Sequence, residues 1–295
     1  MTNPGAVLQT VIVPILLVVL AGYFIQRITR IDTTTLSEVV LHVLAPCLVF
    51  TSITGAVMVG REWLEVCSLA IVATLALIAA SWSIAKIANL SNETSAAFVL
   101  STSFMNAGNL GLPVTMLAFG LRGLELAAIF FVTNMFLMFT VGVIIASRGK
   151  HGLRQALINI VRLPLIYAIV AGTAMKMSHT DTPGPIMQAV SLIAQAAVPG
   201  MLILLGMELS RSGLQKIRDF RWIALSSAVK LLMPYLIVGL VSALVGIAGL
   251  AEKTAILEAS MPTAVFVSLI TLKFGGDSRF ANNVIVSPHW LVSRR

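Results

Sequence analysis

The sequence predicts an all-α integral membrane protein that consists of two inverted repeats of membrane-spanning helices. Charged residues make up only 11% of the 295-residue chain, whereas soluble domains carry about 25% because water surrounds their surfaces. Several uncharged runs, such as residues 6–25 and 231–250, are long enough as helices to cross roughly 30 Å of hydrocarbon. Prolines also recur in the same order in both halves of the chain. These observations exclude an ordinary soluble domain.

Nine membrane spans are predicted from the apolar runs. The N-terminus has no basic segment, so we expect the first run to be retained as a span and not cleaved as a signal peptide. The predicted spans cover residues 6–25, 37–57, 63–87, 95–119, 125–146, 158–177, 186–208, 222–247 and 254–273.

The distribution of basic residues predicts the orientation of these spans. With the N-terminus outside, thirteen Lys and Arg residues lie in inside loops and four in outside loops. Because Lys and Arg accumulate in cytoplasmic loops, we predict that the N-terminus lies outside the plasma membrane, which in a bacterium is the inner membrane. The basic residues lie between apolar runs, so the net charge of +8 does not indicate a nucleic-acid partner.

An internal repeat divides the chain into two halves. Three pairs of prolines are separated by 150, 153 and 149 residues: Pro14 and Pro164, Pro46 and Pro199, and Pro113 and Pro262. We predict a first repeat at residues 1–149, with spans one to five, and a second at residues 150–295, with spans six to nine and an aberrant C-terminal tail. Because five is an odd number, the second copy must insert upside down, as in many secondary transporters. A duplication without mechanistic consequence is the alternative.

The fourth span has the residues of a helix that is broken within the membrane. Gly108, Gly111 and Pro113 weaken a helix, and Asn106 and Asn109 flank them. Broken helices in corresponding positions of two repeats are the best sequence indication of a transport site. The half-helix that begins near Pro113 would direct its positive dipole end toward an anionic group. We therefore predict that these five residues bind the substrate.

The ninth span is expected to break at Pro262, which adds Ser260 and Thr263 to the predicted site. Two ionisable residues are candidates for a charge or coupling role. Lys230 lies about 12 Å into the eighth span and is expected to extend back to the cytoplasmic surface. If it is buried, it would pair with a substrate carboxylate or with Glu258. For Glu258, a proton-carrying role and a helix-start carboxylate are both open.

Other residues in the spans receive structural interpretations. Asn134 is expected to pack between helices, and Glu125 to reach solvent near the end of a span. Pro234 is expected to kink its helix. Cys47 and Cys67 are interpreted as free packing thiols, and neither a metal nor another cofactor is expected.

Four segments of the chain resemble the auxin efflux carrier family. They are LHVLAPCLVFTSI (41–53), GNLGLPVTMLAFG (108–120), AVPGMLILLGMELS (197–210) and LEASMPTAVFVSLIT (257–271). That family includes plant auxin exporters and bacterial permeases for malate, malonate and related anions. Its crossover motif in the fourth span corresponds here to Asn106, Gly108, Asn109, Gly111 and Pro113, and the second crossover corresponds to Pro262.

The resemblance implies a ten-helix bundle of two inverted five-helix repeats, in which helices four and nine are broken and cross at the transport site. It also implies a scaffold of spans one, two, six and seven, through which a homodimer would form. The remaining spans would form a mobile unit that works by an elevator-like movement.

The C-terminal residues depart from the pattern that the resemblance implies. A tenth span should follow Gly276, but the last nineteen residues are DSRFANNVIVSPHWLVSRR. Only residues 280–286 have the character of a helix, and Pro288 and the terminal arginines end it. Because so short a segment does not span a bilayer, we expect the tenth helix to be missing or truncated.

These observations predict a secondary active transporter of small organic anions, such as carboxylates or auxin-like acids, and not an enzyme. The expected partners are the anionic solute, membrane lipid and a second copy of the chain. The alternative is a cation-coupled ion antiporter or channel-like protein of a related inverted-repeat fold. Such sites usually hold pairs of buried carboxylates, and the predicted crossover has Glu258 alone.

Overall fold

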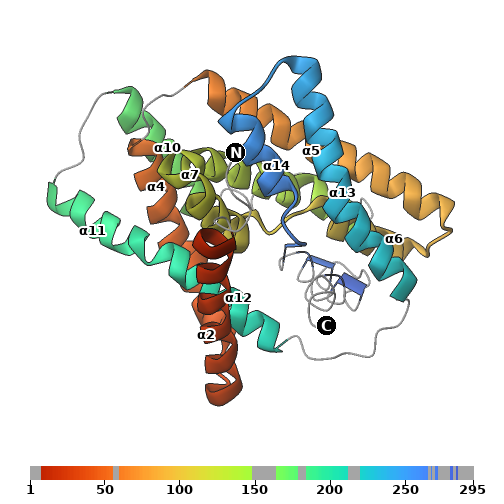
Figure 1. The fold of residues 1–295 in the computed structure, drawn as a ribbon, viewed down its shortest axis with the longest axis horizontal. Helices are drawn as coiled ribbons and strands as arrows, with labels where there is room; N and C mark the ends of the chain where they lie inside the picture. Colours follow the sequence, from red (N-terminus) through yellow and green to blue (C-terminus); the bar gives the residue numbers. More distant parts are fainter. Residues whose placement is uncertain are drawn as a thin grey trace. The chain divides into compact units, whose positions relative to one another are not determined.

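The computed structural model of the chain describes residues 8–55, 60–147, 164–178, 184–211 and 220–264, together with six separate residues: Val267, Ile270, Thr271, Phe280, Ala281 and Val284. Within these residues the chain is helical apart from short connections, and the fold is that of an all-α membrane protein (Figure 1). Five of the described helical stretches are long and apolar enough to cross a membrane: Thr33–Thr54, Arg61–Ile87, Ala107–Ala146, Gly184–Arg211 and Arg221–Val245.

The helices follow the predicted spans closely where both are described. The first span is the π-helical turn η1 (Leu8–Ile12) and α2 (Val13–Thr29), and the second is α3 (Thr33–Val39), η2 (Val40–Leu44) and α4 (Ala45–Thr54). The third is α5 (Arg61–Ile87), and the fourth and fifth are α6 (Asn92–Ser103), η3 (Ala107–Gly111), α7 (Leu112–Leu137), η4 (Met138–Gly142) and α8 (Val143–Ala146). The remaining helices are α10 (Pro164–Met177), α11 (Gly184–Gln195), α12 (Ala197–Arg211), α13 (Phe220–Val245) and α14 (Leu250–Ala259).

Three prolines of the first half each follow a widened helical turn. Pro14, Pro46 and Pro113 lie two residues after the π-helical turns η1, η2 and η3. A proline ring clashes with the carbonyl group four residues earlier, and a π-helical turn relieves such a clash by widening the helix. The local sequence therefore bends these helices without interrupting them, whereas Pro234 lies inside the continuous helix α13.

The described helices form two compact units, and each unit draws helices from both halves of the chain. The first unit comprises Met1–Arg61, Gly108–Val132 and Val161–Gly213, and the second comprises Glu62–Ala107, Thr133–Ile160 and Leu214–Arg295. The first therefore contains α2, α3, α4, α10, α11 and α12, and the second contains α5, α6, α13 and α14. Helix α7 begins in the first unit and ends in the second.

In the first unit, α2 and α12 approach each other at two glycines, and Figure 1 shows them side by side. A side chain at Gly22 would clash with the backbone carbonyl of Ile203, and one at Gly206 would clash with the backbone carbonyl of Val19. The buried side chains of this contact are Val11, Ile15, Val19, Leu202 and Leu205. Lipid gives little hydrophobic force between helices, so close backbone approach at small residues supplies the packing energy instead.

A second helix pair of the first unit repeats this contact. Gly172 of α10 lies against α4, where an added side chain would meet Ile53 at 3.2 Å and the backbone carbonyl of Phe50 at 3.5 Å. Gly172 follows Gly22 by 150 residues, and Ile203 follows Phe50 by 153 residues. The two glycines thus face carbonyl groups at corresponding positions in opposite halves of the chain.

The second unit has a separate core between α5, α6 and α13. Its buried members include Ala85, Phe98 and Ile223. Phe280 and Val284 are also buried in this core, and the rings of Phe98 and Phe280 lie 6.2 Å apart. Phe280, Ala281 and Val284 are the described part of the expected short C-terminal helix, and all three are helical. The rest of the predicted truncated tail lies outside the described residues, as does the predicted boundary between the two repeats at residues 149 and 150.

The glycine contact predicts a sharp effect of one added methyl group. We expect Gly206→Ala to lower the midpoint of thermal unfolding in detergent micelles, since overpacking against a backbone atom costs about 1–3 kcal/mol. The matched control is Gly239→Ala in α13, where an added side chain meets no atom within 4 Å. That change should leave the midpoint equal or higher, because alanine favours a helix over glycine by about 1 kcal/mol. Equal midpoints for the two variants would contradict the close contact.

Candidate functional site

Two broken helices of the second unit cross at residues 104–106 and 262–264. Met105 and Thr263 pair as in an antiparallel sheet. The N–H of Asn106 donates to the carbonyl of Pro262 at 2.7 Å, and the N–H of Ala264 donates to the carbonyl of Phe104 at 3.1 Å. These bonds satisfy four backbone groups that neither α6 nor α14 uses. Irregular backbone inside a membrane protein persists only where such groups find partners.

The local sequence explains why both helices end here. Pro262 has no N–H and disfavours helical backbone at the preceding residue, and α14 ends at Ala259. Helix α6 ends after three hydroxyl residues at 101–103, and Phe104 has extended backbone angles (φ −111°, ψ 119°). Ser and Thr side chains compete for backbone hydrogen bonds and weaken a helix there. The buried aromatic ring of Phe104 packs against Gly142, and this contact stabilises the break.

Polar side chains surround this crossing and are almost completely buried. Asn106 is 7% exposed and Thr263 is 2% exposed, while Ser101 and Ser103 are fully buried. The hydroxyl of Thr263 donates to the carbonyl of Ser101 at 2.6 Å. The hydroxyls of Ser101 and Ser103 have no hydrogen-bond partner in the described part of the chain. Buried hydroxyls without partners cost free energy, so these two groups are available to a ligand.

The fourth-span break differs in position from the sequence prediction. Gly108, Asn109, Gly111 and Pro113, which were expected to be unwound, lie in η3 and in the first turn of α7. The break itself lies just before them, at residues 104–106. Proline is tolerated in the first turn of a helix because its missing N–H has no helical acceptor there. The widened turn η3 accommodates the ring of Pro113, so no unwinding is needed at this point.

The predicted site residues are divided between the two units. Asn106, Ser260, Pro262 and Thr263 belong to the crossing in the second unit. Gly108 to Pro113 belong to the first unit, where Leu110 and Val114 pack against the α2–α12 cluster. Gly108 allows close packing, because a Cβ atom added at this position would lie 2.7 Å from the ring of Phe131.

Lys230 is buried, which corrects the expectation that it extends to the surface. It is 2% exposed in α13, and its ammonium nitrogen makes no hydrogen bond to any described residue. Helix α13 packs against α14 and α6, the two helices that are broken at the crossing. Because the lysine side chain is enclosed by protein, it cannot extend its charge into water.

Glu258 lies next to the break and not near the end of a membrane span. It is fully buried in the last turn of α14, two residues before Ser260. Helix α14 begins at Leu250, four residues earlier than the predicted span, and this shift moves Glu258 deeper. Of its two open interpretations, the helix-start carboxylate is wrong, because Glu252 occupies the first turn.

Of two further polar residues, Glu125 differs from its structural interpretation and Asn134 agrees with it. Glu125 is 3% exposed and not solvated, and its carboxylate pairs with Arg122 at 2.7 Å just after the non-helical Gly120. Asn134 is buried as expected, and its amide nitrogen lies 2.7 Å from the sulfur of Met105, directly at the crossing. The sequence offered no signal for this contact, since Met105 lies in the break after α6 and Asn134 lies in α7.

Several members of the site were missed in the sequence. Ser101, Ser103 and Met105 lie shortly before Asn106 in the sequence. The only sequence feature that pointed to them was a run of three hydroxyl residues in an apolar span. The cysteines behave as predicted, because both Cys47 and Cys67 are free thiols. Among the described residues no group of three or more His, Cys, Asp or Glu side chains is placed to hold a metal ion.

The hydrogen bond between Thr263 and Ser101 predicts a stability difference between two threonines. We expect Thr263→Val to destabilise the protein by about 1–3 kcal/mol, because a buried carbonyl loses its donor. Thr254→Val is the matched control: Thr254 is also fully buried, in α14, and its hydroxyl has no partner among the described residues. Thermal unfolding in micelles compares the two. An equal loss of stability in both variants would contradict the structural role of Thr263.

Comparison with known proteins agrees with this architecture. The family model described as membrane transport protein matches residues 7–292. An uncharacterised transporter of Methanothermobacter thermautotrophicus is 30% identical over 274 residues, which cover 89% of this chain and 87% of the relative. An uncharacterised transporter of Methanocaldococcus jannaschii is 25% identical over 274 residues, with 88% and 87% coverage. The chain therefore belongs to the membrane transport protein family, which is the auxin efflux carrier family of transporters.

Proposed function

We propose that this membrane transporter is a secondary active carrier of small organic anions, such as carboxylates or auxin-like acids, and that its substrate binds at the helix crossing. The observation that carries the proposal is the exchange of backbone hydrogen bonds between Asn106 and Pro262 and between Ala264 and Phe104. Broken helices at corresponding positions of two halves are typical of transport sites. Hydroxyl and amide groups beside the break can donate hydrogen bonds to an anion, and they carry no negative charge that would repel it.

Lys230 supports an anionic substrate. A buried ammonium group is expensive unless it is paired, and an ionisable residue within a membrane span is by default a functional candidate. Lys230 is buried in a helix that packs on both broken helices. A substrate carboxylate would supply the missing negative charge, and the affinity for an anion would offset the free-energy cost of burying the lysine.

The reciprocal glycine contacts support an inverted repeat. Gly22 and Gly172 face carbonyl groups at corresponding positions of opposite halves, as a two-fold relation between the halves requires. We further propose that the first unit is the scaffold and homodimer face, that the second unit carries the substrate in an elevator-like movement, and that the N-terminus lies outside the plasma membrane. The division of helices between the two units agrees with that assignment.

One observation favours a coupled cation as a second possibility. Glu258 is fully buried in the last turn before the break, where its carboxylate is placed to carry a proton or to bind a cation. As the alternative, the chain would act as a cation-coupled ion antiporter with no organic substrate. Uptake of labelled malate or malonate into proteoliposomes, with and without a proton gradient, separates these functions. Anion-independent cation flux would overturn the organic-anion proposal.

The unpartnered hydroxyls predict a loss of uptake without a loss of stability. We expect Ser101→Ala combined with Ser103→Ala to reduce labelled-anion uptake at least about tenfold, equivalent to about 1.4 kcal/mol of binding. The unfolding midpoint should not fall, because neither hydroxyl bonds to a described residue. The control is Ser68→Ala combined with Ser83→Ala, two exposed serines of α5 that bond to their own helix. Wild-type uptake by the Ser101/Ser103 variant would remove these groups from the site.

The buried lysine predicts opposite effects on stability and transport. Lys230→Met keeps the volume of the side chain and removes a buried charge, so we expect equal or higher thermal stability together with loss of anion uptake. Lys86→Met is the control, since Lys86 is exposed at the end of α5. Unchanged uptake kinetics in Lys230→Met would refute a role for this ammonium group in binding the anion.

A further inference from the structure

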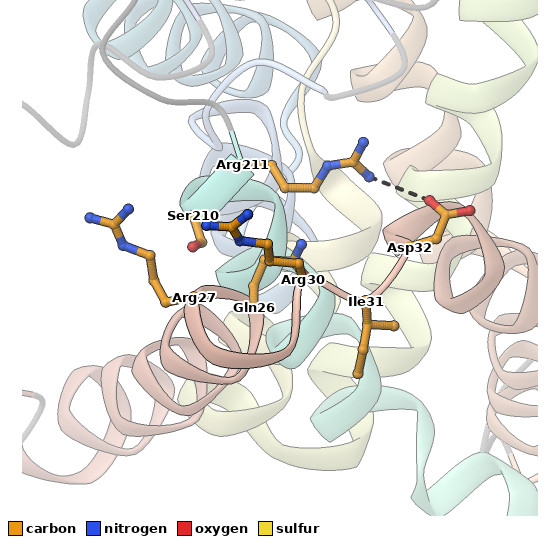
Figure 2. A pocket seen from close by; sticks show the side chains of 7 residues that line it. All are labelled: Gln26, Arg27, Arg30, Ile31, Asp32, Ser210 and Arg211. Carbon is orange, nitrogen blue, oxygen red and sulfur yellow. Dashed lines mark ion pairs between the residues drawn. The ribbon is translucent and has the colours of Figure 1, made fainter.

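A polar cavity lies in the first unit where α2 and α12 end. Its volume is about 450 Å³, and it is lined by Gln26, Arg27, Arg30, Ile31, Asp32, Ser210 and Arg211. Figure 2 shows Gln26 and Arg27 on the last turn of α2, Arg30 directly after this helix, and Arg211 extending toward Asp32. The cavity is at the end of two apolar helices, where a membrane-spanning helix would reach the polar boundary of the bilayer. None of its residues takes part in the helix crossing.

Positive charge exceeds negative charge in this cavity. Among the described residues, Arg211 alone of the three arginines has a carboxylate partner, since it approaches Asp32 at 3.5 Å and also donates to the hydroxyl of Thr33. Hydrogen bonds from the backbone N–H and then the side chain of Thr34 hold the pKa of Asp32 below its usual value, and the charge of Arg211 makes a smaller contribution in the same direction, so this carboxylate stays ionised. Arg27 lies over the ring of Tyr23 at 5.9 Å, and for Arg30 the described part of the chain offers no acidic partner.

The negative ends of the helices and the carboxylate of Asp32 neutralise only part of the positive charge in this cavity. Both helices end at the cavity, and each helix C-terminus carries roughly half a negative charge. Together with Asp32, the helix ends therefore balance about two of the three arginines. The backbone of Arg30 already closes α2, because its N–H donates to the carbonyl of Gln26 from a left-handed conformation. Its guanidinium group is not needed for that cap.

A buried amide provides a second, independent observation. Gln26 is 7% exposed and lines the cavity, yet its side-chain oxygen has no hydrogen-bond partner among the described residues. A buried amide without a partner costs free energy that a ligand hydroxyl or ammonium group would recover. The cavity thus requires an anion that also carries a hydrogen-bond donor, and the half-buried hydroxyl of Ser210 lies beside it.

Apolar side chains next to the cavity favour a lipid over a free anion. Ile31 lines the cavity and is 49% exposed, and Ile28 and Phe24 of the same helix end are 81% and 58% exposed. In a membrane transporter such a surface faces acyl chains. Basic pockets between membrane helices on the cytoplasmic side commonly hold anionic headgroups. In the proposed orientation, Arg27, Arg30 and Arg211 lie on that side.

We propose that this cavity binds the phosphate group of an anionic glycerophospholipid of the phosphatidylglycerol class. Arg27 and Arg30 bind the phosphate oxygens, Gln26 accepts a hydrogen bond from a glycerol hydroxyl, and the acyl chains lie along Ile28 and Phe24. The site is separate from the helix crossing. It would therefore remain if the transported solute proved to be something other than an organic anion.

The test measures thermal stabilisation of the purified full chain in detergent by added short-chain lipid. A ligand that binds the folded state raises the unfolding midpoint. We expect short-chain phosphatidylglycerol to raise it more than phosphatidylcholine of equal chain length, and more than inorganic phosphate. Each arginine near an anionic headgroup is worth about 1 kcal/mol, so the apparent affinity should fall about 30-fold in Arg27→Gln combined with Arg30→Gln. Lys86→Gln, which removes an exposed charge outside the cavity, should keep the wild-type affinity.

Three results would overturn the proposal. Equal stabilisation of the wild-type protein by the anionic and the zwitterionic lipid would show that no headgroup is selected. Undiminished selectivity in the double variant would remove the arginines from the site. Equal stabilisation by inorganic phosphate would assign the cavity to a soluble anion. If the double variant does not fold, Arg27→Gln and Arg30→Gln alone give the same test, each with an expected loss of about fivefold.

Discussion

Two backbone hydrogen bonds at the helix crossing are the constraint on which the polar interior of the second unit depends. A helix broken inside a membrane protein leaves N–H and C=O groups that hydrocarbon cannot satisfy, at several kcal/mol for each group. Asn106 bonds to Pro262, and Ala264 bonds to Phe104, so each break satisfies the other. Neither break would be stable alone, and together they bring buried hydroxyl and amide side chains to one place.

The first unit is held together in a different way. The contact between α2 and α12 depends on how closely their backbones approach at glycines. The contact of Gly22 with α12 and that of Gly172 with α4 use corresponding positions of the two halves. The same kind of contact, between a glycine and a backbone carbonyl of a neighbouring helix, thus occurs twice within the chain. Such contacts tolerate little change in volume, which suits the rigid scaffold that we propose for this unit.

Charge is used in two opposite ways along the chain. Lys230 is enclosed by protein and has no hydrogen-bond partner among the described residues, so its burial raises the free energy of the protein, and binding of the anion that we propose would offset this cost. Arg27 and Arg30 are exposed at a helix end, where water and salt weaken their interactions. The buried charge therefore favours a selective binding event, whereas the exposed charges favour contact with the anionic membrane surface.

The sequence by itself determined the features that depend on local chemistry. Low charge and long apolar runs fixed the membrane class and the approximate spans, and Pro262 fixed the ninth-span break because proline lacks an N–H. The fourth-span break was predicted a few residues too late. Glycine and proline at 108–113 only make a helix easier to deform, and the widened turn η3 absorbs that deformation.

Only the tertiary structure decided which segment of the fourth span becomes extended. Residues 104–106 do so because residues 262–264, far away in the sequence, supply their hydrogen-bond partners. The burial of Lys230 and that of Glu125 were likewise set by neighbouring side chains and helices. Helix periodicity and residue type describe what a segment can do alone. Which groups are paired and which are enclosed depends on contacts between segments, and a single sequence does not contain those distances.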